Sequence, residues 1–166
     1  RFSLQRSQAA SLPLKIAFVG RLVPYKGADI LLDAAADFLK SGQLTVTIIG
    51  DGPQRSLLES MVRRLDIEQS VRFEGWLPHV EIQNRLRLCD GLILPSIREF
   101  GGAVVVEAMA LGVAPIVADY GGPSELVTDT TGIRVAFSDR QSLVTGIKRA
   151  IANVIRFPEQ LDQLGA

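Results

Sequence analysis

Residues 14–39 read LKIAFVGRLVPYKGADILLDAAADFL. An apolar run of strand length, 14–19, is followed by a glycine-bounded turn, 20–27, and then by apolar residues at helical spacing. The helix is expected to bury one stripe and to turn three aspartates toward solvent on its other side. The stripe is Ile30, Leu31, Ala34, Ala35, Phe38 and Leu39, and the aspartates are Asp29, Asp33 and Asp37.

The same alternation of strand and helix continues along the chain. Strands are expected at 14–19, 44–49, 71–75, 91–95, 114–118 and 132–136. A helix is expected to begin at Pro53 and to bury Leu57, Leu58, Met61, Val62 and Leu65. Two more are expected over 78–88 and from near Gly102. The last is expected to begin at a capping box formed by Ser138 and Gln141 and to bury Leu143, Ile147, Ile151 and Val154. Strands that alternate with helices pair in parallel through right-handed crossovers. The sequence therefore predicts a Rossmann-like, doubly wound α/β fold: a parallel sheet of about six strands with helices on both faces.

Composition excludes several classes of function. Eighteen basic and eighteen acidic residues cancel, so no global positive field attracts nucleic acid, and any phosphate binding must be local. Cys89, expected in the core, cannot form an intramolecular disulfide, and with His79 it cannot build a four-ligand zinc site. The apolar run 103–118 is too short to span a membrane and contains Glu107. These features favour a soluble domain in a reducing compartment.

The ends of the chain favour a piece of a larger protein. Residues 1–13 are polar, lack periodicity and end in a proline, which is typical of an interdomain linker. Residues 14–156 are expected to form the folded domain, and 157–166 a truncated tail that begins another helix. No secretory leader is recognised, and residue 1 is Arg.

Ligands of an open parallel sheet bind beyond the carboxyl ends of its strands. The turn after the first strand, 20–27, places Arg21 and Lys26 there, and two cations beside a helix N-terminus favour phosphate. Two solvated cations in an ordinary loop are the alternative. The turn 50–55, GDGPQR, half matches a dinucleotide fingerprint, but Arg55 replaces the third glycine, so a structural tight turn is the favoured interpretation.

The strongest signal follows the fourth strand. The helix from Gly102 is apolar almost all round and is expected to be buried on most faces, with Glu107 as its only charge. A buried carboxylate needs a partner, so Glu107 either pairs with Arg21 or another core group or receives hydroxyls from a ligand. Free amides at the helix start offer an anion site beside Glu99. A sugar nucleotide suits this arrangement, because the amides can donate hydrogen bonds to its phosphate and the carboxylates of Glu99 and Glu107 can accept hydrogen bonds from its sugar hydroxyls.

The glycine turn 119–125 and His79 are two further candidates. The glycine turn 119–125 after the fifth strand lets backbone approach a ligand at the same edge, and Glu125 there is consistent with a helix-dipole residue only. His79 follows a proline at a helix start, where a capping or surface role is favoured over catalysis, because no recognisable triad accompanies it.

These blocks resemble, in order and spacing, the C-terminal domain of retaining glycosyltransferases of the GT-B architecture, family 4, also called group 1. The blocks are FVGRLVPYKGADILLDA (18–34), LTVTIIGDGPQRSLLE (44–59), VRFEGWLP (71–78) with DGLILPS (90–96), and EFGGAVVVEAMALGVAPIVADYGGPSELV (99–127). Glu99 and Glu107 stand as the E-x7-E pair of that family. The resemblance covers residues 14 to about 155.

The resemblance implies a role for each matched position. Arg21 and Lys26 would bind the donor diphosphate and neutralise the leaving group, Glu107 would hold the ribose hydroxyls, and Glu99 would meet hydroxyls of the transferred sugar. The amides of Phe100, Gly101, Gly102 and Ala103 would reach the distal phosphate, and Gly75, Trp76 and Leu77 would seat the base. Phe100 stands one place earlier than in many members of the family, which is expected to alter the sugar pocket.

The function implied is hexosyl transfer with retention from a UDP- or GDP-sugar to a sugar or lipid-linked acceptor. Arg21, Lys26 and helix amides would stabilise the departing diphosphate without a metal ion. The N-terminal acceptor domain is expected to be absent from this chain, so the fragment alone is expected to be inactive. The parent enzyme is expected in the cytoplasm, with peripheral association at the inner membrane face through the missing domain. The alternatives are a sugar-nucleotide epimerase, a phosphorylase-like half, and a non-catalytic nucleotide-binding assembly module.

Overall fold

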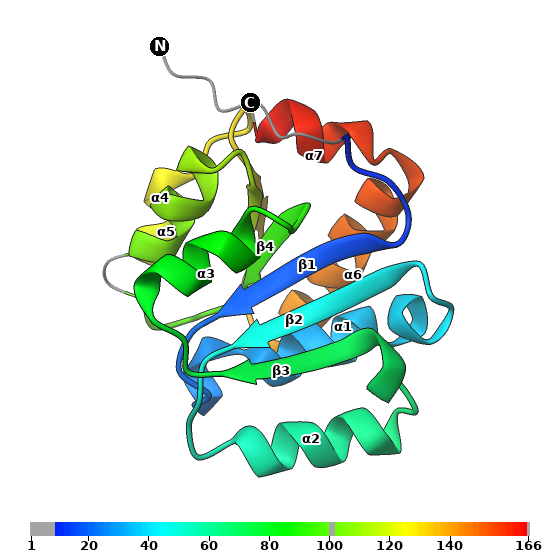
Figure 1. Cartoon of the computed structure of the whole chain (residues 1–166). Helices are drawn as coiled ribbons and strands as arrows, with labels where there is room; N and C mark the ends of the chain where they lie inside the picture. Colours follow the sequence, from blue (N-terminus) through cyan, green and yellow to red (C-terminus); the bar gives the residue numbers. More distant parts are fainter. Residues whose placement is uncertain (1–8, 100–101, 166) are drawn as a thin grey trace.

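The computed structural model describes residues 9–99 and 102–165, which contain one parallel sheet. Its six strands are ordered β3-β2-β1-β4-β5-β6 (Figure 1). The strands are β1 (Leu14–Val19), β2 (Leu44–Ile49), β3 (Val71–Gly75), β4 (Gly91–Leu94), β5 (Ala114–Ala118) and β6 (Ile133–Val135). The predicted Rossmann-like α/β fold is confirmed, and β4 and β6 are shorter than expected by one or two residues.

Helices lie on both faces of the sheet. The helices α1, α2 and α6 lie on one face, and α3, α4 and α5 lie on the other (Figure 1). Their bounds are α1 (Ala28–Lys40), α2 (Arg55–Arg64), α3 (His79–Leu86), α4 (Ala103–Ala110), α5 (Gly122–Leu126), α6 (Arg140–Arg156) and α7 (Glu159–Leu164), with 3-10 turns η1 (Pro24–Lys26) and η2 (Glu68–Ser70). The central strands β4 and β5 are buried along their whole length, because helices cover both of their faces.

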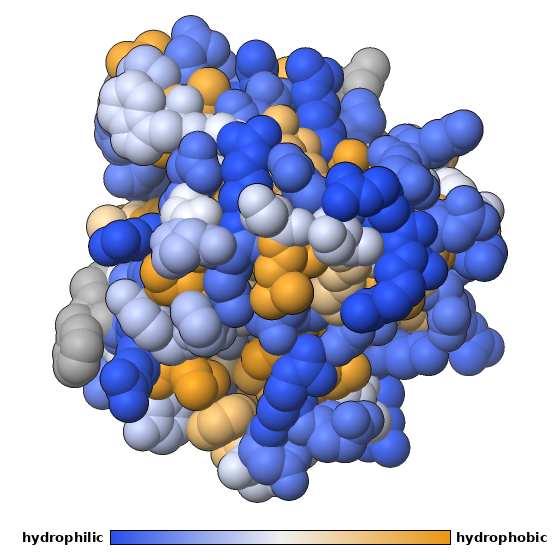
Figure 2. Space-filling view, turned by 90° about the horizontal axis from the view of Figure 1, so that it is seen from below, coloured by the Kyte–Doolittle hydropathy of each residue, from blue (hydrophilic) through white to orange (hydrophobic). Residues whose placement is uncertain are grey.

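Surface and tail features complete the outline. In Figure 2, the side toward which α2 lies shows hydrophobic side chains in small groups separated by hydrophilic ones.

The backbone N–H of Ala10 donates to both carboxylate oxygens of Asp162 at 3.0 and 2.9 Å, so residues 9–13 begin beside α7, the helix expected in the tail. Cys89 is buried, as predicted. Within residues 9–99 and 102–165, no helix is long and apolar enough to cross a membrane.

The strand order reverses between β1 and β4. The chain winds outward from β1 through β2 to β3 and then returns to pair β4 with the free side of β1. The loops that follow β1 and β4 therefore leave neighbouring strands at the same sheet edge and connect to helices on opposite faces. This position is where an open α/β sheet receives a ligand.

The aspartate side of α1, which was expected to face solvent, is partly covered by α6: Asp29 and Asp33 are half-buried, whereas Asp37 is exposed as expected. Arg140 donates to Asp29 at 3.0 Å and to Asp33 at 2.6 Å, and Lys148 donates to Asp37 at 2.7 Å. The pKa of Arg140 is raised above its usual value, and the hydrogen bond to Asp33 is the largest cause. The prediction failed for Asp29 and Asp33 because sequence periodicity does not show which surface helix returns over α1.

Three other local predictions were wrong. The second helix begins at Arg55 instead of Pro53, and Leu57 is exposed, because adjacent helical residues point about 100° apart and Leu58 takes the buried position. The capping box of α6 uses Asp139 and Ser142, one residue later than expected, with the Ser142 N–H donating to Asp139 Oδ1 at 2.7 Å. The helix α4 is not buried on most faces: only Val105 and Ala108 are buried among its residues.

Two glycine turns at the sheet edge are in backbone contact. Leu22 N–H donates to the Asp51 carbonyl at 3.0 Å, and Gln54 N–H donates to the Leu22 carbonyl at 3.0 Å. A Cβ at Gly50, whose φ is +135°, would overlap the carbonyl oxygen of Gly20, and one at Gly52 would lie 2.6 Å from the Leu22 carbonyl oxygen. The structural interpretation of the GDGPQR turn is therefore confirmed: its glycines let two turns approach each other.

We expect Gly50→Ala to destabilise the chain far more than Gly42→Ala. Both glycines have positive φ, but a Cβ at Gly42 meets nothing within 4 Å. Gly42→Ala should therefore cost only left-handed strain, about 1–2 kcal/mol, whereas Gly50→Ala adds a backbone clash and should cost about 3 kcal/mol or more. Urea denaturation measures both. Equal losses would contradict the turn–turn contact.

We expect Arg140→Ala to lower the free energy of unfolding by up to about 1 kcal/mol, because the pairs it removes are partly exposed and screened by solvent. Arg149→Ala is the control, since Arg149 lies on the same helix and forms no ion pair with a described residue. Urea denaturation of both variants checks this. An effect of Arg140→Ala no larger than that of the control would show that these pairs do not stabilise the α1–α6 contact.

Candidate functional site

The loops after β1 and β4 are joined by backbone contacts. The Tyr25 carbonyl accepts hydrogen bonds from Ile97 N–H at 3.0 Å and from the Ser96 hydroxyl at 3.3 Å. Gly27, with φ +78°, packs so closely that a Cβ there would lie 2.8 Å from the Pro95 carbonyl oxygen. The two loops therefore hold each other in a defined position, and side chains from both loops meet at this edge of the sheet.

Lys26 and Glu99 form an ion pair at this junction. Lys26 Nζ donates to Glu99 Oε2, and both side chains are largely buried, with 17% and 18% of their surface exposed. The backbone of Glu99 is also fixed, because its carbonyl accepts from Gly122 N–H at 3.2 Å in the glycine turn after β5. A cation and a carboxylate predicted from separate motifs are thus brought together by three loops.

Arg21 lies in the same turn as Lys26 but is exposed. Among the described residues it forms no ion pair, while the backbone around it is held by the turn–turn contact of Leu22 with Asp51. The suggested pairing of Arg21 with Glu107 is wrong. Arg21 therefore presents an uncompensated guanidinium near the sheet edge, on a backbone fixed in place.

Glu107 pairs with His79. His79 Nε2 lies 2.9 Å from Glu107 Oε1, joining the start of α3 to the middle of α4. The Glu107 side chain is 29% exposed, so it is only partly buried, less than was expected. His79 makes no side-chain cap on α3 and is 62% exposed, so the surface interpretation is confirmed and the capping interpretation is wrong.

The turn 75–77 lies between β3 and α3. Gly75 has φ +71°, a conformation that favours glycine, and its carbonyl accepts from Gly50 N–H at 2.8 Å. Trp76, the one tryptophan of the chain, exposes 75% of its surface, and Leu77 is half-buried. An indole left this far exposed is suited to stack on a flat ring such as a nucleobase.

The start of α4 supplies backbone donors. Gly102 is buried in a left-handed conformation with φ +56°, and Ala103, the first helical residue, is exposed. The amides of the first helical turn have no intrahelical acceptor and carry the positive end of the helix dipole. Phe100 and Gly101, also predicted to donate amides, lie outside the described residues.

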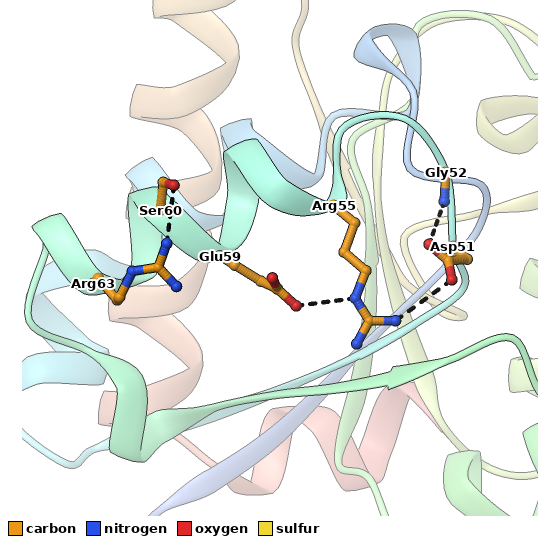
Figure 3. Close-up of polar contacts among 6 residues, drawn as sticks. All are labelled: Asp51, Gly52, Arg55, Glu59, Ser60 and Arg63. Carbon is orange, nitrogen blue, oxygen red and sulfur yellow. Dashed lines mark hydrogen bonds and ion pairs between the residues drawn. The ribbon is translucent and has the colours of Figure 1, made fainter.

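The Arg55 side chain is bound by two carboxylates close to it in the sequence. Figure 3 shows its guanidinium between Glu59, which accepts from Nε at 3.0 Å, and Asp51, which accepts at 3.5 Å, while Arg63 binds Ser60 farther along α2. The pKa of Arg55 is raised above its usual value, and the hydrogen bond to Glu59 is the largest cause. A Cβ at Gly75 would lie 3.3 Å from the same guanidinium, so Arg55 also supports the 75–77 turn.

A metal centre requires several His, Cys, Asp or Glu side chains that converge on one point. Within the described part of the chain, no group of three or more His, Cys, Asp or Glu side chains is arranged to hold a metal ion. The charged side chains at this edge include the Lys26–Glu99 pair, the His79–Glu107 pair and Arg21, which forms no ion pair with a described residue.

The chain belongs to the glycosyl transferases group 1 family, whose model matches residues 2–165. It is 32% identical over 162 residues to D-inositol 3-phosphate glycosyltransferase 2 of Catenulispora acidiphila, covering 90% of this chain and 37% of that protein. It is 32% identical over 148 residues to glycogen synthase of Mycobacterium tuberculosis, covering 88% and 35%. The chain thus spans about a third of the length of these relatives.

A solved structure of Anabaena Alr3699/HepE in complex with UDP and glucose has the same fold. The TM-score is 0.78 and the identity 26%, and the match covers 92% of this chain and 41% of that one. The same Anabaena protein was also solved with UDP-glucose, with a TM-score of 0.77. Membership of the group 1 family, to which the sequence motifs pointed, is therefore shown, and its GT-B relatives share the architecture.

Sequence reasoning missed the partner of Glu107 and the part played by Ser96. Ser96 is one of two polar or charged side chains classed as buried among the described residues, and its hydroxyl contacts a carbonyl 71 positions earlier. The Pro78–His79 dipeptide at a helix start was visible, but only the packing of α3 beside α4 brings His79 to Glu107.

We expect Glu99→Gln to increase affinity for inorganic pyrophosphate, because the change removes the carboxylate that neutralises Lys26. The gain should be roughly fivefold, about 1 kcal/mol, and Lys26→Met should reduce the affinity. Glu159→Gln, on α7, is the matched charge control. NMR titration of the labelled chain measures all four proteins, and a weaker binding of pyrophosphate by Glu99→Gln would contradict an anion site at Lys26.

Proposed function

We propose that this chain is the nucleotide-sugar-binding part of a retaining glycosyltransferase of family 4, which transfers a hexosyl group from a UDP- or GDP-sugar to an acceptor hydroxyl. One observation carries the proposal: Lys26 and Glu99 meet at the point where the strand order reverses. Ligands of open α/β sheets bind there. A cation for phosphate and a carboxylate for sugar hydroxyls are the two groups that such a donor requires.

In the proposed reaction the bond between the anomeric carbon and the distal phosphate oxygen breaks, and the electron pair leaves with the nucleoside diphosphate. Lys26, Arg21 and the first amides of α4 stabilise the charge that develops on that oxygen. Side-chain cations supply the positive charge in this scheme. The acceptor oxygen attacks from the face that the nucleotide leaves and gives its proton to the departing diphosphate oxygen, and configuration is retained.

The Lys26–Glu99 ion pair has a defined place in this scheme. When a diphosphate arrives, Lys26 exchanges the Glu99 carboxylate for a phosphate oxygen. Glu99 is then free to accept hydrogen bonds from hydroxyls of the sugar. The pair thus keeps both groups in position beforehand, and neither has to be buried without a partner.

Other parts of the proposal concern the remainder of the enzyme. Residues 1–13 are proposed as the interdomain linker, 14–156 as the donor domain and 157–166 as a tail leading to an N-terminal acceptor domain. A GT-B site needs both halves, so the 166 residues alone are proposed to bind nucleotide without transferring sugar. We place the parent enzyme in the cytoplasm, at the inner membrane face when its acceptor is lipid-linked.

The single tryptophan allows a direct test of donor binding. Stacking of a base on Trp76 should quench its fluorescence as UDP or GDP is added. Arg21→Ala should weaken the binding of the preferred nucleotide by about tenfold, because a charged hydrogen bond to phosphate contributes about 1.4 kcal/mol. Arg63→Ala, which removes a contact only to Ser60 on α2, is the matched control and should have no effect.

Absence of nucleotide binding by the unmodified chain would overturn the proposal and favour the assembly module. Turnover of UDP-glucose by the isolated 166 residues would overturn the claim that they are inactive alone. Inversion at the anomeric carbon by the parent enzyme, measured by NMR of the product, would overturn the retaining assignment.

A further inference from the structure

The contact between His79 and Glu107 has no evident role in the stability of the fold. His79 is 62% exposed, and exposed pairs of this kind contribute about 0–1 kcal/mol. The attachment of α3 comes from other groups: Leu86 is fully buried, and Arg85 Nε donates to Glu74 Oε1 at 3.3 Å. The His79–Glu107 pair is therefore not needed to hold α3 in place.

The contact controls the orientation of one carboxylate. An ionised carboxylate only accepts hydrogen bonds, so His79 Nε2 carries the hydrogen that it donates to Glu107 Oε1. Within the described residues the second oxygen, Oε2, has no hydrogen-bond partner. Oε1 also keeps acceptor capacity beyond the bond from His79. The carboxylate is thus held by one edge and remains able to accept two further donors.

His79 also lies directly after the turn with the exposed tryptophan. Trp76 and His79 are separated by Leu77 and Pro78, and Pro78 is extended with ψ 152° before the helix begins. The backbone of Gly75 is anchored to Gly50 at 2.8 Å. The turn proposed to seat the base and the carboxylate proposed to hold the ribose are therefore linked through a single imidazole.

We propose that His79 is a positioning residue of the donor site, which orients Glu107 so that its carboxylate accepts the two vicinal ribose hydroxyls of a nucleoside diphosphate. This inference rests on the proposed function. A flexible glutamate loses rotamer entropy when it binds a diol, and a donor that restricts the side chain beforehand reduces this loss. His79 acts through Glu107 and does not itself need to touch the ligand.

The test compares two probes that differ only at the ribose: UDP and 2′,3′-dideoxyuridine diphosphate. The unmodified chain should prefer UDP by about tenfold, as expected for two hydrogen bonds to a charged group. His79→Ala should weaken UDP binding about fivefold and leave the dideoxy probe unchanged, because only the ribose contact depends on the orientation of Glu107. His79→Gln, which keeps a hydrogen-bond donor, should lose less affinity for UDP than His79→Ala.

Val80→Ala is the matched control, since Val80 is the next residue of α3 and is 64% exposed. It should change neither affinity. Trp76 fluorescence and NMR titration give the dissociation constants, and thermal unfolding confirms that each variant is folded. An equal loss for both probes in His79→Ala would show a purely structural role and would overturn the inference.

Glu107→Gln separates failure of the inference from failure of the proposed function. If Glu107→Gln abolishes the preference for UDP while His79→Ala keeps it, Glu107 holds the ribose without help and the positioning role of His79 is overturned. If Glu107→Gln keeps the preference, or the unmodified chain binds neither probe, the proposed role of Glu107 fails together with the inference.

Discussion

The contact between the turn after β1 and the loop after β4 is the constraint on which the candidate site depends. Ile97 N–H and the Ser96 hydroxyl share the Tyr25 carbonyl as acceptor, and Gly27 leaves no room for a side chain against Pro95. Both loops leave adjacent parallel strands and diverge to opposite faces of the sheet. The Lys26–Glu99 pair is a consequence of this arrangement, since each side chain is carried by one of the two loops.

A second contact extends the rigid edge toward β2 and β3. The turn after β1 is bonded through Leu22 to the turn after β2, and Gly50 in that turn is bonded to Gly75 at the end of β3. Gly50 and Gly52 allow the turn after β2 to approach the turn after β1 this closely, because a Cβ at either position would clash with the backbone of Gly20 or Leu22. The exposed Arg21 and Trp76 are therefore carried on backbone that is fixed on both sides, which is the condition for a preorganised binding site.

Several charges of this edge are paired locally. Lys26 is paired with Glu99, Glu107 with His79, and Arg55 with Glu59 and Asp51. Arg21 is the cation of the turn without a described ion-pair partner. An anionic ligand that binds Lys26 has to replace Glu99 as its partner, so binding and rearrangement of the ion pair are coupled in the proposed scheme.

The sequence by itself determined the strands, the order of strand and helix, and the motifs that end at the carboxyl edge of the sheet. These features are local, since periodicity, glycine turns and charged residues after strands are visible within a few positions. Only the tertiary structure decided the pairings: Lys26 with Glu99 across 73 positions, His79 with Glu107 across 28, and Arg140 with Asp33 across 107. Such contacts depend on which elements pack side by side, and residue spacing along one chain carries no direct record of that packing.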